Sequence, residues 1–183
     1  MWLAGVLACS RPAPLPEIAE LPAFHLTDQT GQAVGLDTFA GSVLVVNFIF
    51  TRCPNVCPLL SAEMSEAHDR YAADDRVRFM SVTVDPEYDT PDVLAAYAAR
   101  FGADPKRWRF VTGDAASVRA VVVDGFKSML EALPATPTAP VNVLHGERFV
   151  LVDQGGTIRA YPDPKDDAAM YEAIDALVAA GGR

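Results

Sequence analysis

Two consecutive segments of the sequence decide the fold: VLVVNFIF (residues 43–50) runs directly into TRCPNVCP (residues 51–58). The first segment is rich in β-branched and aromatic residues, and its apolar side chains do not alternate with polar ones. That pattern is typical of a central strand buried on both faces, as in a parallel sheet. After Pro58, apolar residues recur at helical spacing, at Leu60, Met64, Ala67 and Tyr71. We therefore expect a strand, a cysteine-bearing turn and a helix in succession.

Strand and helix patterns alternate on either side of this unit. Such alternation predicts a mainly parallel sheet with right-handed crossovers, and a closing hairpin makes the sheet mixed. We therefore expect an α/β domain with a thioredoxin-like mixed sheet flanked by helices, and with an N-terminal β-hairpin. The expected elements are a hairpin over residues 24–36, strands over 77–84 and 108–112, helices capped by Thr90 and Asp114, an irregular segment over 127–142, a hairpin over 149–161 and a final helix around 170–178.

The length and composition suit one folded domain. Of the 183 residues, half are apolar and 21% are charged, which is ordinary for a globular protein and too apolar for disorder. The net charge of −9 argues against a nucleic-acid partner, because such binding needs a basic face. The longest apolar runs are too short to cross a bilayer, so no transmembrane segment is expected.

The N-terminal segment resembles a lipoprotein signal. Its first nine residues, MWLAGVLAC, form an apolar run that ends in Ala8-Cys9, similar to the lipobox of bacterial lipoproteins, whose cysteine is lipidated. Signal peptides span roughly 15–30 residues with a basic start, and a truncated or mis-assigned start would explain both departures. Four prolines between residues 12 and 22 then suit an extended tether. We expect residues 1–22 to form an anchor remnant and tether, and residues 23–183 to form the domain.

The three cysteines divide into a pair and a single residue. Cys9, Cys53 and Cys57 cannot all pair within one monomer, which excludes a disulfide-dense scaffold. Cys53 and Cys57 lie where the buried strand ends and the next helix begins. A helix N-terminus favours thiolate over thiol, and if the segment is helical, a four-residue spacing puts both sulfurs on one face. The pair can chelate a soft ion or close into a disulfide; the remaining alternative is two core cysteines.

One of the three histidines is a candidate for a further ligand. His145 ends the irregular segment just before the strand at residues 149–152, and functional groups gather on loops at strand ends, where the cysteine loop also lies. His68 follows Glu66 on the polar side of its helix, and we expect it at the solvated surface. His25 is expected to point outward from the first strand.

Acidic residues follow the strand over residues 77–84. Asp85 comes directly after it, at the same edge of the expected sheet as Cys53. Its carboxylate is suited to bond a ligand or to hold the cysteine loop. Glu87 and Asp89 are expected to serve only the turn that leads into the next helix.

Three blocks form a specific combination: VVNFIFTRCPNVCP (residues 45–58), SVTVDPEYDTP (residues 81–91) and His145 leading into FVLVD (residues 149–153). Together they resemble the Sco/SenC family of copper-binding thioredoxin-fold proteins, over roughly residues 15–161. The resemblance implies that Cys53, Cys57 and His145 bind copper, as Cu(I) or Cu(II), with Asp85 as a supporting acid. The family often has Ser or Thr after the histidine, where this chain has Gly146. The resemblance therefore does not define the surface that contacts a partner.

The resemblance implies a copper chaperone on the periplasmic side of a bacterial membrane, held there by a lipid on Cys9. It would deliver copper to the binuclear centre in the copper-bearing subunit of cytochrome c oxidase, or to another copper protein. The alternative is a thiol–disulfide reductase that acts on a partner protein's cysteines, as a dithiol at a helix N-terminus allows. His145 discriminates between the two, since metal binding needs it and exchange does not. A peroxidase is a weaker hypothesis, with Arg52 as the one nearby activating residue.

Overall fold

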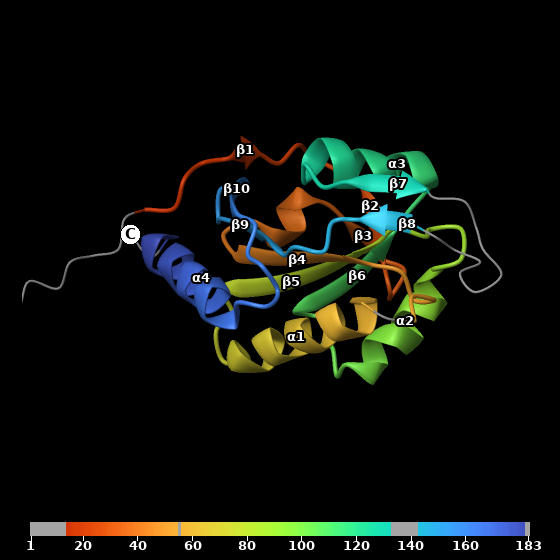
Figure 1. Cartoon of the computed structure of the whole chain (residues 1–183), viewed down its shortest axis with the longest axis horizontal. Helices are drawn as coiled ribbons and strands as arrows, with labels where there is room; N and C mark the ends of the chain where they lie inside the picture. The colour runs from red at the N-terminus through yellow and green to blue at the C-terminus, as the bar shows by residue number, and fades with distance from the viewer. Residues whose placement is uncertain (1–13, 55, 133–142, 182–183) are drawn as a thin grey trace, which may run out of the picture.

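A mixed sheet forms the centre of the computed structural model, which describes residues 14–54, 56–132 and 143–181. Within these residues, eight strands form one sheet in the order β1-β10-β9-β4-β5-β6-β2-β3 (Figure 1). A separate two-stranded ladder pairs β7 with β8. The strands are β1 (Ala19–Glu20), β2 (Leu26–Asp28), β3 (Ala33–Val34), β4 (Val43–Ile49), β5 (Val77–Thr83), β6 (Trp108–Thr112), β7 (Leu130–Ala132), β8 (Val143–His145), β9 (Val150–Val152) and β10 (Thr157–Ala160).

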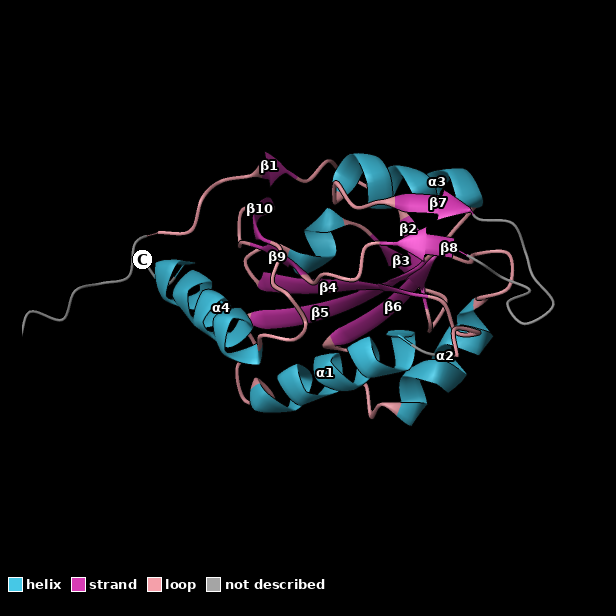
Figure 2. Ribbon diagram, viewed as in Figure 1, coloured by secondary structure: helices cyan, strands magenta, loops and turns pink. Residues whose placement is uncertain are grey.

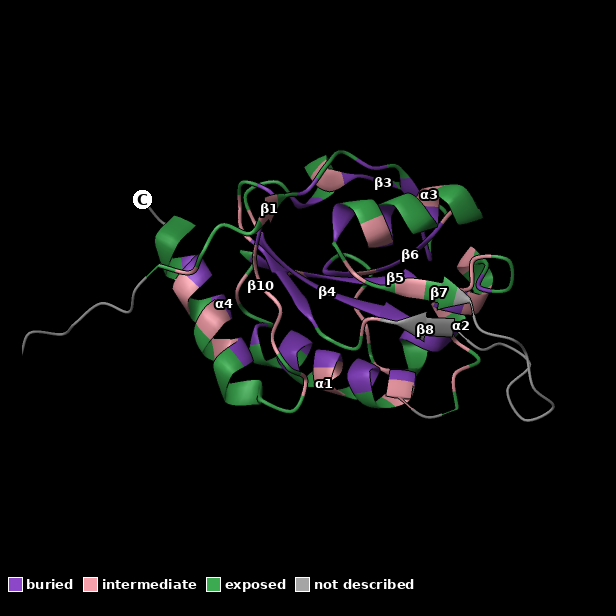
Figure 3. Ribbon diagram, turned by 45° about the horizontal axis from the view of Figure 1, so that its top comes forward, coloured by how far each residue is buried: buried purple, intermediate pink, exposed green. Residues whose placement is uncertain are grey.

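The strand expected at residues 43–50 is confirmed as β4, and all seven of its residues are buried. β4 pairs in parallel with β5, from Val43 opposite Val77 to Ile49 opposite Thr83. On its other side it pairs with β9 in antiparallel fashion. Figure 3 shows burial along the inner strands of the sheet. Because β4 has no solvent-facing side, its apolar residues need not alternate with polar ones.

Helices cover both faces of the sheet (Figure 2). α1 and α2 lie on one face, and α3, continued by the π-helical turn η2, lies on the other. Right-handed crossovers between the parallel strands β4, β5 and β6 place α1 and α2 on one face, and the chain then returns across the sheet to β9 with α3 on the other face. The helices are η1 (Leu36–Phe39), α1 (Val56–Arg70), α2 (Pro91–Arg100), α3 (Ala115–Arg119), η2 (Ala120–Gly125) and α4 (Asp167–Gly181).

Local signals account for several boundaries. Thr90 accepts a hydrogen bond from the Val93 N–H at 3.4 Å and Asp114 accepts one from the Ser117 N–H at 2.9 Å, which confirms both expected helix caps. The N-terminal hairpin is β2–β3, and its turn contains Gly31 with φ +80°. The second expected hairpin is β9–β10. The expected mixed sheet, flanking helices and N-terminal hairpin are therefore confirmed.

The described end of the expected tether lies against the domain. Residues 19–20 form β1 and pair with β10, and Leu21 is buried. Upstream, the Arg159 guanidinium donates to the backbone carbonyls of Leu15 and Pro16 and pairs with Asp153. The segment is extended, as its prolines dictate, but residues 15–21 lie against the domain. The division of the chain after residue 22 stays a prediction.

Two further elements differ from the sequence-based expectation. α1 begins at Val56, so Cys57 lies in its first turn and Pro58 does not precede the helix. The segment expected to be irregular contains β7, which pairs with β8 from Leu130 opposite His145 to Ala132 opposite Val143. Residues 133–142 lie outside the described residues. No described helix is long and apolar enough to span a bilayer.

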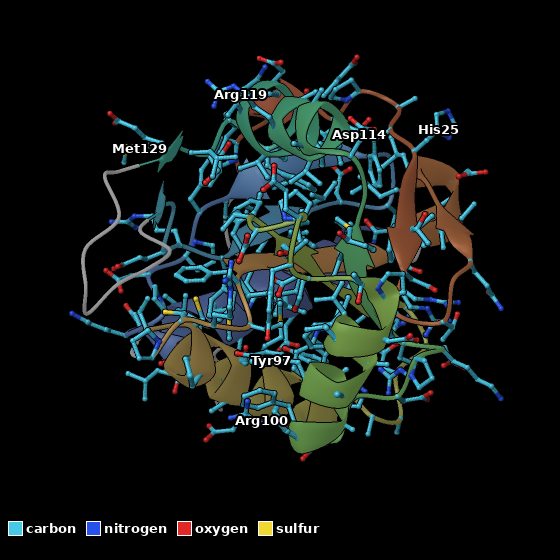
Figure 4. The ribbon with its side chains drawn as sticks, turned by 90° about the vertical axis from the view of Figure 1, so that its right-hand side faces the viewer. His25, Tyr97, Arg100, Asp114, Arg119 and Met129 are labelled. Carbon is cyan, nitrogen blue, oxygen red and sulfur yellow. The ribbon has the colours of Figure 1, made fainter. Side chains whose placement is uncertain are left out.

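The expectation that His68 is solvated is wrong. Its side chain is buried on α1, with ring centroids 5.6 Å from Phe79 and 5.7 Å from Trp108. Nδ1 lies 3.5 Å from the exposed carboxylate of Asp69, and neither ring nitrogen has a hydrogen-bond partner among the described residues. The neighbouring charges of Glu66 and Asp69 misled the prediction, because the face of α1 that carries His68 packs on the sheet. His25 is exposed, as expected, and Figure 4 shows it directed away from the domain.

Replacing His68 by leucine should leave the free energy of unfolding unchanged or raise it by up to about 1 kcal/mol. The substitution keeps apolar contacts and removes two buried polar atoms that make no hydrogen bond. Urea unfolding at pH 7 measures the change, and His25→Leu at the exposed site is the control, expected within about 0.5 kcal/mol of the native protein. A loss above about 2 kcal/mol in His68→Leu would show that the imidazole makes a buried polar interaction.

Candidate functional site

The cysteine pair lies at the carboxyl end of β4, at the edge where α1 begins. Cys53 is half-buried on the turn between β4 and α1, and Cys57 is fully buried in the first turn of α1. The two residues are not joined by a disulfide. The thiol of Cys57 is hydrogen-bonded to Cys53, so the two sulfurs face each other. Cys53 lies before the first residue of α1, so the pair does not share a helical face, and its closeness comes from the turn.

The two cysteines differ in environment. Burial raises the pKa of the Cys57 thiol far above its ordinary value, and the hydrogen bond to Cys53 acts in the same direction. A hydrogen bond with the Phe50 backbone opposes the shift without cancelling it. At Cys57, burial acts against the thiolate form that a helix N-terminus favours. Cys53 is the more accessible sulfur of the pair.

Asp85 contacts the cysteine loop through Arg52. Its carboxylate accepts hydrogen bonds from the Arg52 guanidinium at 2.6 and 3.1 Å, and the guanidinium lies 4.0 Å from the centroid of the Tyr88 ring. The Asp85 backbone N–H donates to the Thr83 hydroxyl at 3.0 Å. The loop after β5 and the loop after β4 are thus joined beside Cys53, as the parallel pairing of their strands predicts. A direct role of Asp85 toward a bound metal stays a prediction.

Asp89 is a residue that sequence reasoning missed. Its side chain is fully buried, where a turn residue was expected. It accepts hydrogen bonds from the Thr51 N–H at 3.1 Å, from the Thr51 hydroxyl, and from the Thr83 hydroxyl at 2.5 Å. Burial raises its pKa, and these hydrogen bonds oppose the shift only in part. The one signal in the sequence was the presence of threonines at the ends of two adjacent strands.

The topology brings the backbone of His145 toward the same edge. β9 runs antiparallel to β4 with Val150 opposite Val46, so the chain enters β9 from the edge at which β4 ends. His145 is the last residue of β8, and the next N–H, of Gly146, donates to the Met129 carbonyl at 3.1 Å. Figure 4, which faces this end of the molecule, shows Met129 projecting outward. The structure describes the backbone of His145 but not its side chain.

Gly146 has a steric reason to be glycine. A Cβ atom there would lie 2.1 Å from the Ser128 hydroxyl oxygen, well inside van der Waals contact. Serine or threonine at this position would therefore require the Ser128 hydroxyl to rotate away, whereas the Ser128 Cβ and the Met129 backbone lie at ordinary contact distances.

The described side chains do not by themselves complete a metal site. Among them, no group of three His, Cys, Asp or Glu residues is placed to hold one ion. Cys53 and Cys57 supply two sulfur ligands, and the third expected ligand, the His145 imidazole, lies outside the described side chains. Cys9, the expected lipidation site, also lies outside the described residues.

The mixed sheet and the cysteine pair at the end of its central strand define a thioredoxin-like domain with a dithiol site. The chain belongs to the SCO1/SenC family, whose family model matches residues 14–179. The family resemblance and the thioredoxin-like fold expected from the sequence are thereby confirmed.

Solved structures of similar proteins support this assignment. A SCO1/SenC family lipoprotein from Bacillus anthracis has 27% identity and a TM-score of 0.77, with 87% of this chain and 95% of that chain covered. Bradyrhizobium japonicum ScoI, solved with copper bound, has 30% identity and a TM-score of 0.71, with 84% and 98% covered. BsSco, described as a member of the Sco family of cytochrome c oxidase assembly proteins with a disulfide switch, has 26% identity and a TM-score of 0.73, with 92% and 99% covered.

The difference between the two cysteines predicts unequal reactivity. In a Cys9→Ala background, Cys57→Ser protein, which retains Cys53, should react with iodoacetamide at pH 7 at least about tenfold faster than Cys53→Ser protein, because the thiolate is the nucleophile and Cys57 is buried and protonated. The slow rate of Cys57 should keep rising from pH 8 to pH 10, since its pKa is raised. Equal rates at pH 7 would contradict the assignment of Cys57 as a buried thiol.

Proposed function

We propose that the chain binds copper through Cys53, Cys57 and His145 and delivers it to the binuclear copper centre of cytochrome c oxidase. The observation that carries the proposal is the facing cysteine pair at the end of β4, beside the edge from which the chain enters β9. The Bradyrhizobium japonicum relative binds copper, and BsSco belongs to a family of oxidase assembly proteins. The proposed acceptor is the copper-bearing subunit of the oxidase.

The proposed ligands suit both oxidation states of copper. Thiolates select Cu(I), and imidazole also suits Cu(II), so two sulfurs and one nitrogen can hold the ion in either state. Metal ligation requires the thiolate form. Because Cys57 is protonated in the metal-free protein, copper binding must displace its proton, and copper affinity should rise with pH.

A dithiol without a histidine would serve the alternative, thiol–disulfide exchange with a partner's cysteines. The half-buried Cys53 is then the attacking sulfur and the buried Cys57 the resolving one. The family relationship favours copper binding over this alternative, and the contribution of His145 separates the two experimentally.

His145→Ala should weaken Cu(II) binding by at least about a hundredfold, because it removes one of three proposed ligands. Cu(I) binding should fall less, since two thiolates hold that ion in linear geometry. Titration of reduced Cys9→Ala protein should show one copper per monomer and a thiolate-to-Cu(II) charge-transfer band. Loss of the band in both Cys53→Ser and Cys57→Ser is the matched control.

The same His145→Ala protein decides between delivery and reduction. Its Cys53–Cys57 disulfide should still form and be reduced, while oxidase assembly in cells should fail. If His145→Ala supports assembly as well as the native protein does, copper ligation by His145 is not the function, and the exchange alternative takes its place.

We further propose that the domain acts on the periplasmic side of a bacterial membrane, tethered by a lipid on Cys9. The Ala8-Cys9 junction and the prolines that follow it support the proposal, and the Bacillus anthracis relative is a lipoprotein. The proposed division is an anchor and tether over residues 1–22 and a copper-binding domain over residues 23–183, with the end of the tether lying against β10.

Expressed from its natural start, the protein should partition with membranes, and Cys9→Ala should release it without loss of copper binding. A lipid supplies the membrane affinity, whereas Cys9 takes no part in the proposed metal site. Cell fractionation with mass spectrometry of the N-terminal peptide measures this. An unmodified Cys9 in the membrane fraction would contradict the proposal.

A further inference from the structure

The turn that carries Cys53 is short, and side chains of the loop after β5 hold it in place. The Cys53 N–H donates to the Phe50 carbonyl at 3.1 Å, which closes a four-residue turn with Thr51 and Arg52 at its centre. Thr51 is bonded at both its backbone N–H and its hydroxyl, and in both cases the acceptor is the carboxylate of Asp89. Cys57 is fixed differently, by its place in α1 and by burial. Asp89 thus holds the Cys53 turn through Thr51, and Asp85 contacts the same turn through Arg52.

Asp89 is itself fixed to the sheet. Its backbone N–H donates to the Asp85 carbonyl at 2.9 Å, and its carboxylate accepts from Thr83, the last residue of β5. The Thr83 hydroxyl in turn accepts the Asp85 N–H. The Asp89 carboxylate thus joins the end of β5 to the turn after β4, with Thr51 and Asp89 separated by 38 residues of chain.

A comparison with Asp28, a second buried carboxylate, shows how the hydrogen-bond donors around Asp89 differ. Asp28 is also fully buried and also accepts from a threonine, Thr30, but it pairs with the Arg109 guanidinium. Burial tends to raise its pKa, yet hydrogen bonds from Thr30 and Gln32 and the Arg109 charge hold the pKa below its ordinary value. Asp28 therefore forms an ion pair with Arg109 and stabilises the β2–β3 turn. The Asp89 carboxylate instead accepts hydrogen bonds from uncharged donors, which follow β4 and end β5 beside the cysteines.

We propose that Asp89 is a positioning residue for the metal site, which sets the placement of Cys53 opposite Cys57 through Thr51. The copper measurements in this inference rest on the proposed function. They report on Asp89 because the affinity and absorption of bound copper depend on the separation and angle of its two sulfur ligands. The same placement also governs how readily the two thiols form a disulfide, which gives a readout that needs no metal.

The test compares Asp89→Ala, Asp89→Asn and the control Asp28→Ala in the Cys9→Ala background. Asp89→Ala removes every acceptor for Thr51. Asp89→Asn keeps the shape and one carbonyl oxygen, and its amide can donate to a reoriented Thr51 hydroxyl. Each variant is measured by urea unfolding, by the Cu(II) charge-transfer spectrum and affinity, and by the Cys53–Cys57 dithiol–disulfide equilibrium against glutathione.

Asp89→Ala should weaken Cu(II) binding by about 10- to 100-fold, the usual cost of losing a group that orients a ligand. It should also shift the charge-transfer band and change the dithiol–disulfide equilibrium constant by at least about tenfold, and Asp89→Asn should restore most of each property. Asp28→Ala should lower stability and leave all three site properties unchanged.

Three results would overturn the inference. The first is an Asp89→Ala protein that folds with native copper and disulfide properties. The second is an Asp28→Ala protein that alters those properties as much as Asp89→Ala does. The third is an Asp89→Asn protein that folds but restores neither property. If the native protein binds no copper, the proposed function fails, and the glutathione equilibrium alone still decides the role of Asp89.

Discussion

The parallel pairing of β4 with β5 is the constraint on which the rest of the structure depends. Both strands are almost wholly buried, so their register is fixed, because a slip by one residue would change the face to which every side chain points. The pairing ends at Ile49 opposite Thr83. Everything that follows the two strands, the cysteine turn from one and the Asp85–Asp89 loop from the other, must therefore meet at one edge.

The two sulfurs at that edge differ in burial and in what holds them. Cys57 is buried in α1 and protonated, whereas Cys53 lies on a turn that side chains of the neighbouring loop hold. Asp85 acts on the turn through Arg52, and Asp89 acts on it through Thr51. The proposed delivery of copper would use this difference, with Cys57 enclosed by the domain and Cys53 accessible to a partner.

The sequence predicted most of the fold, because its signals were local or came from complete burial: the unalternating run of β4, the Thr90 and Asp114 caps and the Gly31 turn. It also predicted that the cysteine pair lies where the buried strand ends and the helix begins, because the apolar run stops just before Cys53. It failed where contacts between distant elements determine whether a side chain is buried. His68 and Asp89 lie among polar neighbours in sequence yet are buried, and only the packing of α1 and the meeting of two strand ends explain this. β1 and β7 are short strands that exist through their partners β10 and β8.

The central claim is that copper is held by two sulfurs of this pair and one imidazole. X-ray absorption at the copper edge of Cys9→Ala protein loaded with one equivalent of Cu(I) or Cu(II) measures the ligand set directly. The account predicts two copper–sulfur distances near 2.2–2.3 Å, by analogy with about 2.3 Å for zinc–thiolate bonds, together with an imidazole nitrogen that disappears in His145→Ala. A copper shell made only of nitrogen and oxygen, or one unchanged in Cys57→Ser, would contradict it.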